Sequence, residues 1–71
     1  MVDWDEQAVS LLRAEMGRRG LKAPGLADAL RKIGVEERAD NLKNKIARGR
    51  FSAAFLLQCL AAMNVKTIHL D

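Results

Sequence analysis

The chain has 71 residues, of which 49% are hydrophobic and 30% charged; this is the composition of one small globular domain and excludes a disordered chain. No apolar run approaches the roughly 20 residues of a membrane span, and the acidic segment MVDWDEQ lacks the apolar region of a secretion signal. A lone Cys59 excludes an internal disulfide and, with a lone His69, a zinc site. We therefore expect a cytoplasmic protein, with no metal, cofactor or small-molecule substrate.

The net charge of +3 is unevenly distributed along the chain. Residues 1–17 carry four acids and one base, residues 18–50 carry ten bases and four acids, and residues 51–71 carry one of each. A basic middle segment between an acidic and a neutral end favours a surface that faces a polyanion.

Two helices are predicted in the first half, at about residues 4–19 and 24–33. Asp3 suits the N-cap of the first, and Gly20 ends it after two arginines. Pro24 suits the first turn of the second helix, because its missing N–H has no intrahelical partner there. Apolar residues at helical spacing mark the inner faces: Ala8, Leu11, Leu12 and Met16, then Leu26, Ala27, Leu30 and Ile33.

A third helix at about 37–48 and a fourth at about 53–63 complete an all-α domain. Gly49 ends the third helix, and Ser52 suits the N-cap of the fourth. The fourth helix has Gln58 as its one polar residue, so it must be covered on most sides by the core or by a partner. The tail KTIHL, with its β-branched residues, predicts a possible short strand.

The predicted third helix has a pattern of apolar and polar residues that indicates a binding surface. Leu42 and Ile46 mark its inner stripe, and polar and basic side chains occupy the other side. Asn and Arg suit bidentate contacts to adenine and guanine edges, so four residues are candidate base readers: Arg38, Asn41, Asn44 and Arg48. Five others are candidates for holding phosphates: Lys22, Lys43, Lys45, Arg50 and Ser52. A solvated basic face is the alternative interpretation.

A single recognition helix makes few contacts, so we expect a homodimer that binds two half-sites on duplex DNA. The excess apolar area of the fourth helix and the tail predicts the dimer surface: Phe55, Leu56, Cys59, Ile68 and Leu70, with Phe55, Leu56 or Cys59 exposed on the monomer. No nucleophile lies at a meaningful spacing from His69, so we do not expect an enzyme.

The segments LLRAEMGRRGL, LADALRKIGV, NLKNKIARGRFS and LLQCLAAMNV, over about residues 9–65, resemble the lambda-repressor/Cro-type (XRE-like) helix-turn-helix family. The chain also looks close to short bacterial proteins known only as a domain of unknown function, especially in NLKNKIARGRFSAAFLLQCL. The resemblance departs at Lys22 and Ala23, where the family has a Ser or Thr cap and a DNA-contacting Gln. Arg31, Lys32 and Ile33 also lengthen the second helix by nearly a turn.

The helix-turn-helix resemblance implies a four-to-five-helix domain over residues 1–71 and a bacterial or phage transcriptional regulator, associated with the nucleoid. The alternative function is a protein-interaction module that uses the apolar helix at 53–63, with an incidental basic face. The operator and the sign of regulation are not encoded in any motif of the sequence.

Overall fold

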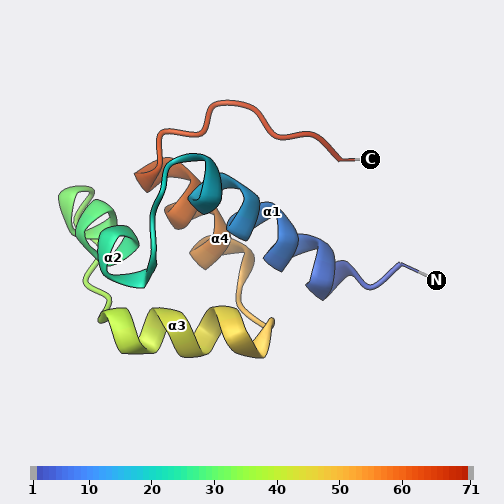
Figure 1. Ribbon diagram of the computed structural model, residues 1–71, viewed down its shortest axis with the longest axis horizontal. Coiled ribbons are helices and arrows are strands. Elements are labelled where there is room, and N and C mark those ends of the chain that lie inside the picture. Colours follow the sequence, from blue (N-terminus) through green and yellow to red (C-terminus); the bar gives the residue numbers. More distant parts are fainter. Residues whose placement is uncertain (1, 71) are drawn as a thin grey trace.

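The computed structural model describes residues 2–70, and within that range it contains four α-helices and no strand (Figure 1). The helices are α1 (Trp4–Arg18), α2 (Ala23–Lys32), α3 (Ala39–Arg48) and α4 (Ala53–Ala62). The all-α prediction is therefore confirmed, and each helix begins and ends within two residues of its predicted position. No helix in the described range is long and apolar enough to span a membrane.

Two of the N-caps expected from the sequence are present. The backbone N–H groups of Asp5 and Glu6 donate to Oδ1 of Asp3, at 3.0 and 3.2 Å. The N–H of Phe55 donates to Oγ of Ser52 at 3.0 Å. Each side chain thus satisfies N–H groups that have no partner inside the helix, and this fixes where α1 and α4 begin.

Three helices end in the same way, with a residue in the left-handed region followed by an apolar residue. The N–H of that apolar residue donates to the carbonyl five residues back, at 2.9 Å in all three cases. This geometry satisfies the last carbonyls and turns the apolar side chain back toward the core. The three pairs are Gly20–Leu21 after α1, Gly34–Val35 after α2 and Asn64–Val65 after α4.

The core lies where the inner faces of the four helices meet. α2 packs against both α3 and α4, and α1 packs against α4. Five side chains drawn from all four helices are fully buried: Leu12, Leu26, Leu30, Leu42 and Cys59. Ile33 was expected on the inner face of the second helix, but it is the C-cap of α2 and is exposed.

Arg19, at the end of α1, pairs with the buried carboxylate of Glu15 and also contacts the end of α4. Glu15 is buried, and its carboxylate accepts from Arg18 at 2.8 Å and from Arg19 at 2.7 Å. The hydrogen bond from Arg19 outweighs burial and holds the pKa of Glu15 below its ordinary value. Nε of Arg19 also donates to the carbonyl of Met63 at 2.8 Å, so this guanidinium fixes the point where the tail begins.

The predicted C-terminal strand is absent: residues 65–70 are described and have no regular secondary structure. The β-branched residues of KTIHL fit a strand, but a strand needs a neighbour for its N–H and C=O groups. The described part of the chain offers no other strand to pair with. In Figure 1 the tail runs along one edge of the molecule, opposite the edge formed by α3.

Candidate nucleic-acid interface

α3 is held by one stripe of apolar side chains and leaves the rest of its surface to solvent. Leu42 and Ile46 are buried against the core, at 0% and 7% exposure. Gly49 ends the helix with φ +73°, and its backbone N–H donates to the carbonyls of Lys45 and Ile46. The exposed residues of the helix are Asp40, Asn41, Lys43, Asn44, Ala47 and Arg48.

Three of the four candidate base readers share this exposed face. Asn41, Asn44 and Arg48 are spaced three and four apart, which brings their side chains onto neighbouring turns of the helix. Among the described residues, none of these three side chains is held in a hydrogen bond or an ion pair with another side chain. Their amide and guanidinium groups are therefore available to an external partner.

Arg38, the fourth candidate reader, lies apart from the other three. It is the N-cap of α3, and its Nε lies 3.3 Å from Oδ1 of Asp40. Both side chains are largely exposed, so the pair is weak in water. The carboxylate of Asp40 nevertheless offsets the positive charge of Arg38 at this end of α3.

Lys45 was expected at a phosphate, but the structure directs it inward. Its Nζ lies 3.1 Å from Oε1 of Glu37 and 4.7 Å from the ring centroid of Phe55. An ammonium group over an aromatic face is attracted by the negative charge density of the ring. Lys45 lies next to Ile46 and one turn after Leu42, and this position predicts a half-buried side chain.

The other candidate phosphate contacts are exposed and lie around α3. Lys43 lies on the flank of the helix opposite Asn41, because two residues correspond to about 200° of helical rotation. Lys22 is the N-cap of α2, and Ser52 already accepts a hydrogen bond as the N-cap of α4. Arg50 lies in the turn between α3 and α4, with its Nε 3.7 Å from Oδ2 of Asp5.

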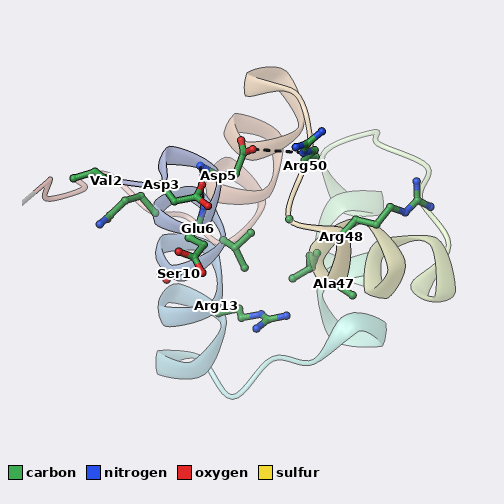
Figure 2. A pocket seen from close by; sticks show the side chains of 13 residues that line it. Val2, Asp3, Asp5, Glu6, Ser10, Arg13, Ala47, Arg48 and Arg50 are labelled. Atoms are coloured by element: carbon green, nitrogen blue, oxygen red, sulfur yellow. Dashed lines mark hydrogen bonds and ion pairs between the residues drawn. The ribbon is translucent and has the colours of Figure 1, made fainter.

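A groove of about 620 Å³ separates the first half of α1 from the C-terminal end of α3. Figure 2 shows Asp5 paired with Arg50 at one end, Arg13 reaching from α1 toward Ala47, and Arg48 pointing away from α1. The charged residues that line the groove are three acids and three bases: Asp3, Asp5, Glu6, Arg13, Arg48 and Arg50.

Arg13 is a basic group beside α3 to which the sequence analysis assigned no role. It lines this groove and has no ion-pair partner among the described residues. It is the sole base of residues 1–17. Its position as a single base within an acidic segment is the one sequence signal that distinguishes Arg13. This signal does not reveal that α1 lies beside the end of α3.

The opposite end of α3 is acidic. A groove of about 650 Å³ lies between α2 and the start of α3, and its charged lining has four acids and two bases. These are Asp28, Glu36, Glu37 and Asp40, with Arg31 and Arg38. Unpaired positive charge on α3 therefore lies beyond its first turn, at Lys43 in the middle of the helix and Arg48 at its end.

The residues expected at a dimer surface divide into two groups. Phe55, Leu56 or Cys59 was expected to be exposed; Phe55 and Cys59 are buried, and Leu56 is half-buried. Phe55 packs against Phe51 with ring centroids 5.1 Å apart, and burial, assisted by Glu37, raises the pKa of the Cys59 thiol to about 11. Ile68 and Leu70 are exposed, as is Leu57, which the sequence analysis did not select.

No three His, Cys, Asp or Glu side chains within residues 2–70 are grouped so that they could hold a metal ion. No curated protein and no solved structure matches the chain. A family model described as a domain of unknown function, DUF6471, matches residues 4–68, a range that includes all four helices. The chain therefore belongs to the DUF6471 family.

Proposed function

We propose that this protein binds duplex DNA through the exposed face of α3 and acts as a small transcriptional regulator. The observation that carries the proposal is that Asn41, Asn44 and Arg48 project together from a helix anchored by Leu42 and Ile46. A B-form major groove is wide enough to admit an α-helix. These side chains also have no side-chain hydrogen-bond or ion-pair partner within residues 2–70, so binding would break no such contact there.

Base recognition is assigned to Asn44 and Arg48, with Asn41 beside them. The side-chain N–H of an Asn can donate to N7 of adenine while its Oδ1 accepts from the N6 amino group, and an Arg guanidinium can donate to O6 and N7 of guanine. Asn44 lies opposite the buried stripe of α3, so it is the side chain that would reach deepest into the groove.

Phosphate binding is assigned to Lys43, Lys22 and Arg50, which are exposed. Arg50 must exchange its 3.7 Å contact with Asp5 for a phosphate, and this costs little because both side chains are in water. Such contacts supply affinity and orientation without reading the sequence. The hydroxyl of Ser52 can still donate to a phosphate while its oxygen caps α4.

The charge distribution favours an approach by the C-terminal half of α3. In many helix-turn-helix proteins the N-terminal residues of the recognition helix contact the bases. Here the groove at that end has more acids than bases, and although Lys45 and Arg38 offset Glu37 and Asp40, its net negative charge would oppose phosphates. We therefore expect Lys43, Asn44 and Arg48 to lie closer to the DNA than Arg38.

A homodimer is part of the proposal, because one short helix contacts too few base pairs to define a long site. Two copies related by a twofold axis would read two half-sites separated by about one turn of DNA, roughly 34 Å. A footprint on a preferred site would give that separation directly.

The test is a titration of the protein into a fluorescently labelled duplex at several salt concentrations. Three phosphate contacts per protomer predict that log K falls against log salt with a slope of about −2.7 per protomer. Binding that weakens with this steepness supports the proposal. No binding to random or genomic duplexes at low salt would overturn it.

The alternative is a protein-interaction module, which is favoured by the exposure of Leu57 on the uncharged helix α4. In that case α3 is a solvated face, and the titration gives no binding at any salt concentration. The two functions are therefore separated by the same experiment.

A further inference from the structure

We propose that a second copy of this chain docks on the outer surface of α4 together with the tail that follows it. This α4–tail surface comprises Ala54, Leu57, Ala61, Val65 and Ile68. The inference locates the contact within the homodimer of the proposed function. The inference rests on the proposed function only for the role of this dimer on DNA; the self-association itself can be tested without DNA.

Exposed apolar side chains lie on this surface and on the end of the tail that follows it. Of the six large hydrophobic residues exposed in the described range, three lie on α4 or the tail: Leu57 at 65%, Ile68 at 41% and Leu70 at 77%. A groove of about 400 Å³ lies between α4 and the tail, and its lining is apolar apart from Lys66 and Thr67. Contiguous exposed apolar surface of this kind marks interaction sites.

The absence of charge identifies the occupant as a second copy. Residues 51–65 contain no Asp, Glu, Lys or Arg, although the whole chain has 21 such residues. A twofold contact places the same surface on both sides, so it must be complementary to itself. The α4–tail surface, whose groove has Lys66 as its one charged residue, meets this condition better than the basic face of α3, which would place several like charges together.

The surface is also fixed in shape before any partner arrives. Arg19 holds the carbonyl of Met63 at 2.8 Å, and the N–H of Val65 donates to the carbonyl of Leu60 at 2.9 Å. These two bonds set the direction in which the tail leaves α4. A surface that is already ordered loses less conformational entropy on association.

The position of the tail leaves the candidate DNA face free. In Figure 1 residues 65–70 run along the edge of the molecule opposite α3. A second copy that covers the tail would therefore not cover Asn44 or Arg48. Self-association and DNA binding can then be measured separately.

The experiment is sedimentation equilibrium of the full chain, without DNA, over a wide range of protein concentrations. Leu57→Arg adds a charge at the centre of the α4–tail surface, and Ile33→Arg adds the same charge at the exposed C-cap of α2 as a matched control. Ile68→Arg is a second variant on the surface, and it lies outside every helix, so it cannot disrupt one.

We expect the unmodified chain and Ile33→Arg to form dimers with equal affinity. We expect Leu57→Arg and Ile68→Arg to associate at least about tenfold more weakly, because a charge would be buried without a partner. Circular dichroism should show unchanged helix content in Ile68→Arg. An unmodified chain that stays monomeric at every concentration, or an Ile68→Arg variant that associates as well as Ile33→Arg, would overturn the inference, whatever the result with DNA.

Discussion

α3 and α4 are both ten residues long and lie next to each other in the chain, yet their outer surfaces differ completely. α3 buries Leu42 and Ile46 and covers its remaining surface with charges and amides. α4 buries Phe55, Cys59 and Leu60, and its outer surface has alanines, Leu57 and Gln58 but no charge.

This difference separates two kinds of surface within one small domain. The outer face of α3 is suited to a charged, hydrated partner, because its polar groups can exchange water for phosphates and base edges. The outer face of α4 is suited to a partner that removes apolar area from water. The four predictions below test the comparison in order of expected effect.

The largest effect is expected from truncating the leucine that anchors α3. Leu42→Ala removes a fully buried side chain and should lower the free energy of unfolding by about 2–5 kcal/mol. The matched change Leu57→Ala removes an exposed leucine from α4 and should cost less than about 0.5 kcal/mol in the monomer. Urea unfolding at low protein concentration measures both. Equal losses of unfolding free energy in the two variants would mean that Leu57, on the outer face of α4, is packed as tightly as the buried Leu42 of α3.

A smaller effect is expected from truncating an amide on each helix. Asn44→Ala should weaken binding to a preferred DNA site by about 1–3 kcal/mol and reduce discrimination at one base. Gln58→Ala removes an exposed amide from α4 and should leave DNA affinity unchanged. Fluorescence anisotropy on preferred and random duplexes compares the two. An equal loss on both duplexes for Asn44→Ala would make Asn44 a phosphate contact.

The turn between the two helices depends on Gly49. Gly49→Ala should lower the free energy of unfolding by about 1–2 kcal/mol, because an L-residue resists its φ of +73°. The new methyl group would also lie 3.4 Å from Cγ2 of Val9. Gly17→Ala is the control: Gly17 lies within α1 with open space around it, so alanine should stabilise the helix. Thermal unfolding of both variants should therefore shift in opposite directions.

The smallest effect concerns the inner face of α4. Burial raises the pKa of the Cys59 thiol to about 11, above its ordinary value of 9.0 in the unfolded chain. As pH rises from 9 to 11 the unfolded chain loses this proton while the folded chain keeps it, so stability falls with pH. Between pH 9 and 11 the free energy of unfolding of the unmodified chain should therefore fall relative to that of the Cys59→Ala variant. A constant difference would contradict a buried thiol at this position.

Local signals in the sequence were enough to place the helices and the inner stripe of α3. Asp3 and Ser52 cap helices as expected, because a cap depends on a side chain and the N–H groups two or three residues later. Leu42 and Ile46 are buried as their helical spacing predicts. The same spacing correctly predicts the exposure of Asn41, Asn44 and Arg48.

Features that depend on distant contacts could not be predicted in this way. Local β-propensity in the tail gave no information on whether a second strand exists. The apolar composition of α4 could not reveal that Phe55 and Cys59 face inward while Leu57 faces out. The acids that flank α3 come partly from α1 and α2, so their proximity to the candidate site is known only from the fold.

The central claim is that α3, and not α4, meets DNA. The most direct measurement is a series of amide ¹H–¹⁵N spectra recorded as a short duplex is added at low salt. We expect the largest shifts on residues 43–48 and only small shifts on the outer residues of α4, such as Ala54 and Ala61. Shifts confined to α4, or none at any duplex concentration, would contradict it.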